Sequence, residues 1–322
     1  MKVVIVGGVA GGATAAARLR RLDEHAEIII IERTHFVSYA NCGLPYYIGG
    51  TITDRSKLTL QTPESFHNRF NIEVRIDQEV TKIDRAAKQV AIHNLATGET
   101  YTETYDKLIS PGAHPVIPDL PGIHSSRIHT LRTVEDTFAI ADFIEHEQTG
   151  HQDKPFRATI VGGGFIGLEM AENLVERGIE VTILQRPNHL MHSLDNDIAS
   201  LLHNRMREAG IALKLNADVI GFSENNREIY TTFKDKEDKT GASQQHIASD
   251  MVVLAIGVAP ENKLAVEAGL ELGIKGALKV DEHLLTSDKD IYAIGDAIET
   301  TQIVSGKPAH IALAGPANKQ GR

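Results

Sequence analysis

A pattern of strand, glycine-rich turn, helix and strand occurs twice in this chain and constrains its fold more than any other feature. The first copy runs from an apolar stretch at 3–6 through a glycine turn at 7–12 and a helical stretch to Leu22, then to a second apolar stretch at 28–31. The second copy begins at 159–161 and ends at 181–184. Each copy predicts a βαβ unit with parallel strands, so we expect an α/β fold.

The spacing of the glycines indicates what the two turns bind. Glycines let the backbone bend tightly and approach a pyrophosphate, and the helix that follows offers free N–H groups and the positive end of its dipole. Val9 occupies the middle glycine position of the first copy. The second copy has the complete spacing, at Gly162, Gly164 and Gly167. One match can reflect packing alone, but two matches, each between a strand and a helix, predict two dinucleotide sites.

The residue that ends the second strand of each unit distinguishes the two ligands. Glu32 lies about 20 residues beyond the first turn, where a carboxylate accepts hydrogen bonds from a ribose diol. The equivalent position in the second copy is Gln185, followed by Arg186. Because this position lacks a carboxylate, a 2′-phosphate is not repelled there, and Arg186 can pair with it. The alternative is that Arg186 is simply a solvent-exposed residue at the end of the strand. The sequence therefore allows NADPH and leaves NADH open.

Bulk properties exclude several classes of partner. A net charge of −10 provides no electrostatic surface for nucleic acid or for an anionic membrane. No apolar run approaches the roughly 20 residues that cross a bilayer, and the first residues enter a strand with no signal-peptide pattern. The single cysteine, Cys42, cannot form an internal disulfide, which favours a cytoplasmic location. Taken alone, one cysteine is more typical of a buried apolar residue than of a reactive one.

Other segments carry weaker signals. Residues 72–110 alternate in a way that predicts short strands, with a turn at 96–98, and the four prolines between Pro111 and Pro121 predict a crossing between domains. The polar stretch 234–245 predicts a surface hairpin or loop, and 251–257 predicts a buried strand. The fifteen histidines show no spacing that indicates a metal site.

The residues around the cysteine carry a family resemblance. The run 41–47 reads Asn-Cys-Gly-Leu-Pro-Tyr-Tyr, and the stretch 286–296 is similar to a second FAD signature that ends at Asp296. Residues 110–113 and 256–260 are similar to two domain-crossing turns. Together with the glycine turns, these segments resemble the single-cysteine branch of the pyridine nucleotide–disulfide oxidoreductases: coenzyme A-disulfide reductases, persulfide reductases and NADH oxidases. The resemblance covers the whole chain.

The resemblance implies a glutathione-reductase-like architecture with two Rossmann-like domains. An FAD-binding domain is expected at 1–114 and 248–322, and an NAD(P)-binding domain at 115–247. Relatives continue into an interface domain that carries the dimer contact. We therefore expect that this domain is missing from the chain and that the full-length protein is a homodimer.

The resemblance also implies a reaction. Hydride passes from NAD(P)H through FAD to Cys42, and from there to a small-molecule thiol or disulfide substrate, a coenzyme A disulfide or persulfide. One cysteine suffices when the substrate supplies the second sulfur. A helix that opens at 43–45 would favour the Cys42 thiolate. The alternatives are an NADH oxidase that works through a Cys42 sulfenic acid and an idle FAD/NAD-binding redox module. Relatives that reduce oxygen or peroxide usually carry a histidine in the first glycine turn, and its absence here favours a thiol substrate.

The site residues follow from the motifs and from the resemblance. Phe165 is expected to cover the flavin, with helix packing as the alternative, and Glu169 to lie near the nicotinamide, with a plain surface carboxylate as the alternative. The expected cofactor contacts are Gly7, Val9, Ala10, Gly11, Gly12, Glu32, Arg33, Asn41, Pro111, Gly112, Gly162, Gly164, Phe165, Ile166, Gly167, Glu169, Gln185, Arg186, Gly257 and Asp296. The expected coenzyme A contacts are Thr14, Arg18, Arg21, Ser38 and Asn41. A solvated helix exterior is the alternative for the arginines of the first helix.

Overall fold

The computed structural model describes residues 1–150, 154–236 and 244–322, and these form two compact units. Unit 1 comprises residues 1–40, 59–114 and 258–322. Unit 2 comprises residues 41–58 and 115–257. The chain leaves unit 1 after His114 and returns at Val258, and short strands at these two crossings pair with each other.

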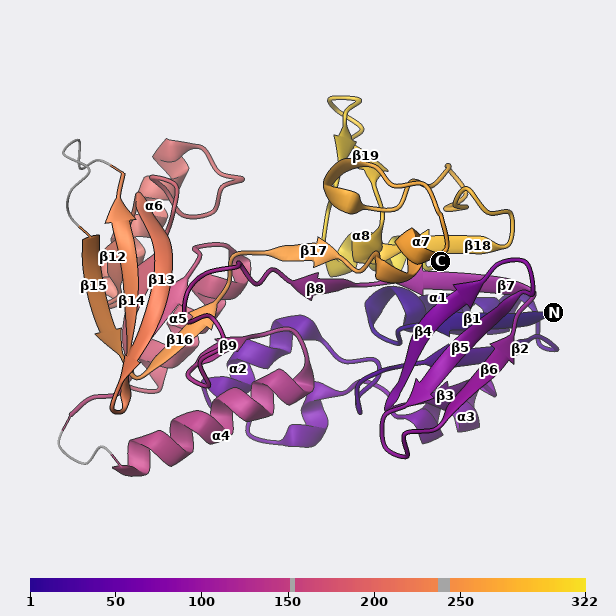
Figure 1. Ribbon diagram of the computed structural model, residues 1–322, viewed down its shortest axis with the longest axis horizontal. Helices are drawn as coiled ribbons and strands as arrows, with labels where there is room; N and C mark the ends of the chain where they lie inside the picture. Colours follow the sequence, from indigo (N-terminus) through magenta and orange to yellow (C-terminus); the bar gives the residue numbers. More distant parts are fainter. Residues whose placement is uncertain (151–153, 237–243) are drawn as a thin grey trace. The chain divides into compact units, whose positions relative to one another are not determined.

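Unit 1 is built on a five-stranded parallel sheet in the order β18-β7-β1-β2-β3 (Figure 1). Its strands are β1 (Lys2–Val6), β2 (Glu27–Ile31), β3 (Glu73–Arg75), β7 (Lys107–Pro111) and β18 (Ile291–Ile294). The central strands are apolar throughout because both faces of the sheet are covered. Successive residues therefore point into two different cores.

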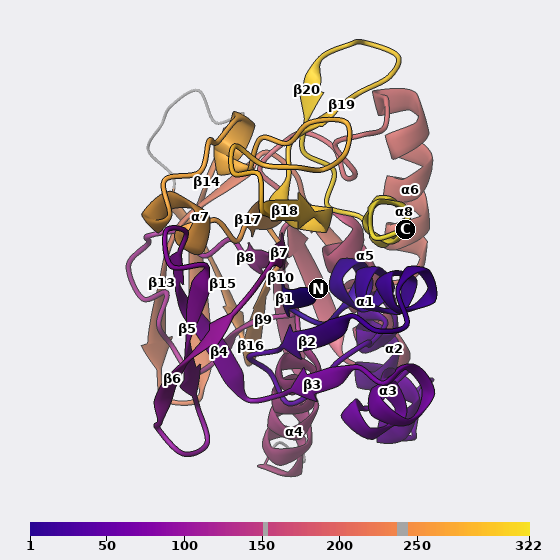
Figure 2. The same cartoon turned by 90° about the vertical axis from the view of Figure 1, so that its right-hand side faces the viewer.

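One face of this sheet packs on helices and the other on a second, antiparallel sheet. Val3 and Ile5 join the core that includes α1 (Ala10–Leu22) and α3 (Pro63–Phe70), whereas Val4 joins the core under the β4-β5-β6 sheet. Those three strands are β4 (Gln78–Asp84), β5 (Gln89–Asn94) and β6 (Thr100–Thr104). Figure 2 shows α1 beside α8 (Ala314–Gln320), in agreement with the contacts between these helices. The predicted strands of 72–110 and the turn at 96–98 are confirmed.

The remaining elements of unit 1 are short and come mainly from the C-terminal part of the chain. They are β8 (Ala113–Pro115), β17 (Val258–Pro260), α7 (Lys263–Glu267), the 3₁₀ turns η3 (Ile274–Gly276) and η4 (Gly295–Ala297), and the hairpin strands β19 (Thr300–Thr301) and β20 (Pro308–Ala309).

Unit 2 contains a second parallel sheet, in the order β12-β11-β10-β16-β9. Its strands are β9 (Ile128–Thr130), β10 (Arg157–Val161), β11 (Glu180–Leu184), β12 (Ala212–Lys214) and β16 (Met251–Leu254). An antiparallel sheet covers one face, where Phe222 and Ile229 pack on Val161 and Val252. Its strands are β13 (Ala217–Asn225), β14 (Glu228–Asp235) and β15 (Gln244–Ser249). The predicted surface loop within 234–245 falls partly on 237–243, outside the described residues.

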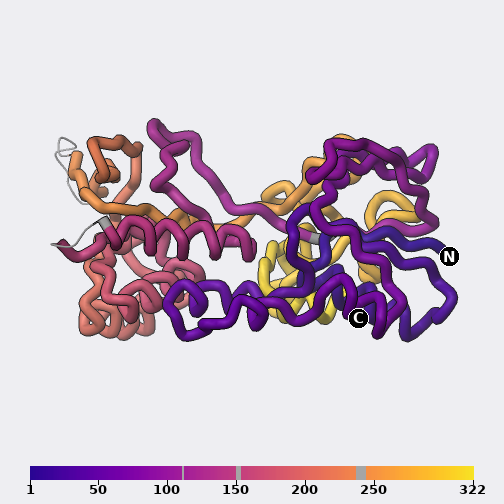
Figure 3. The backbone as a smooth tube through the Cα atoms, turned by 90° about the horizontal axis from the view of Figure 1, so that it is seen from below, coloured from indigo at the N-terminus to yellow at the C-terminus, as the bar shows by residue number. Residues whose placement is uncertain are grey.

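The helices of unit 2 include the segment that carries the cysteine. They are η1 (Asn41–Gly43), α2 (Leu44–Ile48), η2 (Arg55–Leu58), α4 (Val134–Gly150), α5 (Phe165–Glu176) and α6 (Asn196–Glu208). α2 contacts both α4 and α5, and Figure 3 shows the 41–58 segment running beside the long helix α4.

The compact units group the chain differently from the expected domains in two places, and the domain boundaries themselves stay a prediction. Residues 41–58 were expected in the FAD-binding domain, but they pack with unit 2, because α2 lies on α4 and α5. The return crossing was expected at residue 248, but it lies at 257–258, because β16 is a strand of the unit 2 sheet between β10 and β9. The buried strand predicted at 251–257 is confirmed and ends at Leu254.

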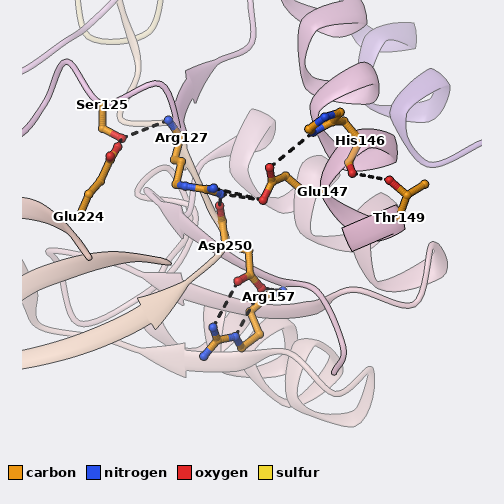
Figure 4. A network of polar contacts seen from close by, with 8 residues as sticks. All are labelled: Ser125, Arg127, His146, Glu147, Thr149, Arg157, Glu224 and Asp250. Carbon is orange, nitrogen blue, oxygen red and sulfur yellow. Dashed lines mark hydrogen bonds and ion pairs between the residues drawn. The ribbon is translucent and has the colours of Figure 1, made fainter. Parts of the chain in front are cut away.

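A network of charged residues secures the amino ends of the unit 2 strands (Figure 4). Asp250 is buried and accepts hydrogen bonds from the backbone and side chain of Arg157, at 2.7 and 3.3 Å. Its backbone carbonyl accepts from Arg127, whose guanidinium also pairs with Glu147 of α4 at 3.1 Å. This network lies at the opposite end of the strands from the glycine turn, so we assign it a structural role.

Candidate functional site: two glycine turns and a cysteine segment

The strand ends of unit 1 bring the predicted FAD residues to one edge of the sheet. β1, β2, β7 and β18 are parallel, so their carboxyl ends meet, and these ends lead into the turn at 7–12, Glu32, Gly112 and Asp296. Ligands of open α/β sheets bind at this edge. Most of the predicted contacts for FAD are therefore collected in one place by the fold.

The turn at 7–12 fits a dinucleotide. Gly7 has φ +95°, which favours glycine, and a Cβ on Gly12 would lie 1.9 Å from the carbonyl oxygen of Gly7. The helix α1 begins directly after Val9, and no side chain of the described residues caps it there. Its first N–H groups are thus available to a pyrophosphate that binds at the turn.

Glu32 holds this turn in place. The side chain is buried, its Oε2 accepts from the Gly8 amide at 2.8 Å, and its Oε1 accepts from the amide and hydroxyl of Thr34. A carboxylate has about four acceptor positions, so one remains for a ribose hydroxyl. Arg33 is exposed, and its guanidinium lies 3.4 Å from Glu261.

The Asp296 region joins the same edge through contacts that the sequence does not reveal. His310 Nε2 lies 2.8 Å from the backbone oxygen of Asp296, and Gln320 of α8 accepts a hydrogen bond from the Gly295 amide at 2.7 Å. Ile294 packs against Gly11, where a Cβ would lie 3.2 Å from its side chain. No local pattern links Gln320 to a turn that lies 25 residues earlier, which is why sequence reasoning missed it.

Unit 2 has the same kind of glycine turn as unit 1, at the carboxyl ends of its own strands. Gly162 has φ +112°, and a Cβ on Gly167 would lie 2.0 Å from the Gly162 carbonyl oxygen. Gln185 is buried and accepts from the Gly163 amide at 2.9 Å, as Glu32 does from Gly8. Its Nε2 donates to the backbone of His189. The carboxamide therefore bonds to the backbone on both sides.

The beginning of α5 is not covered by other residues near Gly164, which leaves room for a ligand. A Cβ built on Gly164 would meet nothing within 4 Å, and Phe165 is 59% exposed. The exposed ring argues against ordinary helix packing as the reason for this aromatic residue. Ile166 is partly buried, Arg186 is exposed, and Gly257 follows β16 at the same edge with φ +111°.

Glu169 lies one turn further along α5, in a partly buried position. Burial and the neighbouring Glu172 raise its pKa. Glu172 and burial also raise the pKa of Tyr46 on α2, the helix that packs on α5. The raised pKa keeps the Tyr46 phenol protonated and argues against a role as a general base.

Cys42 lies in η1, is exposed, and comes immediately before Gly43, the N-cap of α2. A helix does open in the stretch 43–45, and it starts at Leu44. Asn41 belongs to the same segment, and its Nδ2 donates to the backbone oxygen of Arg132 at 2.9 Å. The structure places both residues in unit 2.

The other predicted coenzyme A contacts lie in unit 1. Thr14 donates to Asn318 of α8 at 2.7 Å, and Ser38 has φ +52° with its amide bonded to the Gly8 carbonyl. The Nε atom of Arg18 is buried without a hydrogen-bond partner among the described residues, while Arg21 is exposed. The neighbouring Arg20 is structural, since it donates to four backbone carbonyls, which belong to Phe70, Asp23, Glu24 and Asn71.

The described residues lack two further features. None of their helices combines the length and apolar character needed to cross a membrane. They also contain no group of three or more His, Cys, Asp or Glu side chains placed to hold a metal ion.

Known proteins share this arrangement over the whole chain. A coenzyme A disulfide reductase of Staphylococcus haemolyticus is 35% identical over 319 residues, which is 99% of this chain and 68% of that protein. A reduced Bacillus anthracis protein named CoADR-RHD superposes with a TM-score of 0.92 at 48% identity, covering all of this chain and 55% of that one. An NAD-dependent persulfide reductase from A. fulgidus superposes with a TM-score of 0.91 at 34% identity, covering all of this chain and 58% of that one.

The chain thus spans between about half and two thirds of the length of these relatives. The model of one family matches residues 1–321 and so includes both glycine turns and the cysteine segment between them. On this evidence the chain belongs to the pyridine nucleotide-disulphide oxidoreductase family.

Proposed function

We propose that this chain is the FAD- and NAD(P)H-binding part of a reductase whose Cys42 transfers electrons to a disulfide or persulfide of coenzyme A. One observation carries the proposal: the only cysteine is exposed and is separated by one residue, Gly43, from α2, a helix that packs on α5, and α5 begins at the glycine turn 162–167. Similarity to a coenzyme A disulfide reductase and to a persulfide reductase supports the substrate class.

The residues would divide the chemistry as follows. The turn at 7–12 with Glu32 and Asp296 would hold FAD, and the turn at 162–167 would hold the nicotinamide nucleotide. Bound FAD supplies a carrier that accepts hydride from the nicotinamide and passes electrons to sulfur. Unit 1 and unit 2 would thus serve as the FAD-binding and NAD(P)-binding domains, and Cys42 belongs to unit 2.

Cys42 would act by thiol–disulfide exchange. Its thiolate attacks one sulfur of the disulfide, forms a mixed disulfide, and releases the other half as a thiolate that takes up a proton. Two electrons from NAD(P)H then reduce the mixed disulfide, so that NAD(P)H, one proton and one disulfide yield NAD(P)⁺ and two thiols. With a coenzyme A persulfide the products are the thiol and hydrogen sulfide. Arg18, whose buried Nε has no hydrogen-bond partner among the described residues, and Arg21 would bind the phosphates of coenzyme A.

Replacement of the cysteine tests the proposal. Cys42→Ser should retain the yellow flavin and NADPH binding but lose the reduction of coenzyme A disulfide. The reaction is measured under anaerobic conditions by the amount of free thiol that it produces. Unchanged thiol production would remove Cys42 from the reaction. Oxygen consumption that matches NADH loss in the wild type would instead favour an oxidase, and failure of NADPH to bleach the flavin would favour an idle module.

A further inference from the structure

Both ends of the segment that carries Cys42 are fastened within unit 2. The start is held by Asn41, which donates to the backbone of Arg132. Gly43 has helical angles, φ −83° and ψ −18°, so η1 continues into α2 as one run of helical backbone. Any group that fixes the far end of α2 therefore also limits the movement of Cys42.

Arg177, the C-cap residue of α5, makes one such contact. Its Nη1 donates to the carbonyl oxygen of Ile48, the last residue of α2, at 2.9 Å. Carbonyls at the end of a helix lack partners within the helix, and a guanidinium is a strong donor for them. The Nη2 of Arg177 lies 3.5 Å from Glu145 of α4, so this side chain connects α5 with both α2 and α4.

Asn173 makes the second contact, one turn earlier on α5. It is fully buried, and its Nδ2 donates to the Glu169 carbonyl at 2.8 Å, which fixes the carboxamide. A Cβ on Gly49 would lie 2.3 Å from Asn173 Oδ1. Gly49 has φ −70°, which any residue adopts, so only this close approach of α2 to α5 requires glycine there.

The helix α5 therefore contacts two parts of the site. The first residues of α5 form part of the glycine turn at 162–167, where Gly167 packs on Gly162. The other end of α5 holds α2. We propose that Arg177 and Asn173 are positioning residues for Cys42. Through their contacts with Ile48 and Gly49 they fix the cysteine segment on α5, the helix that begins at the glycine turn 162–167. The proposal deepens the proposed function, since it takes Cys42 as the reacting thiol.

Hydrogen exchange of the full chain provides a test that does not depend on turnover. The amides of Gly49 and Ile52 are bonded to carbonyls of α2, so peptides covering 44–52 report how firmly the segment is held. Arg177→Met should speed their exchange about 10-fold or more, and Arg177→Lys, which keeps a donor, should restore most of the protection. Arg205→Met, at a site 77% exposed on α6, is the matched control and should change nothing.

Kinetics provide the second readout. With coenzyme A disulfide, Arg177→Met should lower kcat about 10-fold while the KM for NADPH stays within about 2-fold, because misplacement of a reacting group affects the chemical step. Gly49→Ala should act in the same direction, since the new methyl group forces α2 away from Asn173, and it replaces Arg177→Met if that variant does not fold.

The outcomes are separable. Unchanged exchange at 44–52 in both Arg177→Met and Gly49→Ala would overturn the proposal, and so would a lysine variant no better than the methionine variant. If the wild type does not reduce coenzyme A disulfide, the proposed function fails, while the exchange experiment still decides whether these residues hold the segment.

Discussion

Gly164 and Gly167 belong to the same turn but differ in what surrounds their α-carbons. A Cβ on Gly167 would meet the Gly162 carbonyl at 2.0 Å, whereas a Cβ on Gly164 would meet no atom within 4 Å. Gly167 is thus required by the packing of helix on strand, whereas we expect Gly164 to be required by the approach of a ligand. The sequence pattern shows both as glycine and does not distinguish these roles.

Alanine at each position should separate the two roles. Gly167→Ala should destabilise unit 2 by about 1–3 kcal/mol, because the new methyl group forces the turn apart. Gly164→Ala should leave the unfolding temperature unchanged or slightly raised and weaken NADH binding, because only the bound nucleotide meets the methyl group. Thermal unfolding and NADH titration measure the two effects, and equal destabilisation by both variants would contradict this division.

Arg186 should determine how well a 2′-phosphate is accepted. Gln185 before it bonds to the backbone on both sides, and neither residue is a carboxylate that would repel the phosphate. Arg186→Ala should weaken NADPH binding about 10-fold, because the loss of one charge-assisted pair costs about 1.4 kcal/mol. The affinity for NADH should stay within about 2-fold of the wild type. An equal loss for both nucleotides would instead place Arg186 against a group that they share.

At the scale of elements, β9 carries a partly buried histidine that should make unit 2 sensitive to acid. His129 of β9 packs on Phe143 of α4 with ring centroids 4.8 Å apart, and burial lowers its pKa to about 4. The usual value in an unfolded chain is about 6.5. The neutral form is therefore favoured by folding, and its contribution is complete above about pH 6.5 and lost as the pH falls towards 4.

Replacement of this histidine by a neutral residue should remove that dependence. The unfolding temperature of His129→Gln should fall less steeply than that of the wild type between pH 6.5 and 4, even if it is lower at pH 7.5. His25→Gln, at a site 87% exposed, is the control and should follow the wild type. Parallel curves for wild type and His129→Gln would show that the histidine does not titrate in this range.

At the scale of the whole molecule, each unit has hydrophobic clusters of its own. Among the described residues, two large clusters lie within 1–40, 59–114 and 258–322, and two smaller ones lie within 115–257. Each glycine turn lies at the edge of its own sheet. We therefore expect loss of one dinucleotide to leave binding of the other intact.

Gly12→Ala tests this independence. Its methyl group would lie 1.9 Å from the Gly7 carbonyl, so the variant should be purified with little or no flavin, as judged by absorbance near 450 nm relative to 280 nm. NADH binding, followed by quenching of the nucleotide fluorescence, should stay within about 3-fold of the wild type, since unit 2 is unchanged. A parallel loss of NADH binding would show that the turns depend on each other.

Much of this architecture is determined by the sequence over short distances. Both βαβ units were predictable because apolar runs, turn glycines and helix lengths are local properties, as the agreement for β1, α1 and β2 illustrates. The residues at the strand ends, such as Glu32 and Gln185, were predictable as well, because a parallel strand followed by a glycine turn fixes which edge they reach. The cysteine segment was recognisable from its own run of seven residues.

The tertiary structure decided what depends on distant partners. The amino-acid sequence alone does not show that residues 41–58 pack with unit 2 or that β16 lies between β10 and β9. It also does not show that Arg177 bonds to Ile48, 129 residues away. These outcomes depend on which apolar faces bury each other and on which buried polar groups find donors, and such pairings are set by the whole fold. Sequence spacing thus specified the two dinucleotide turns, and long-range packing specified where the thiol is held.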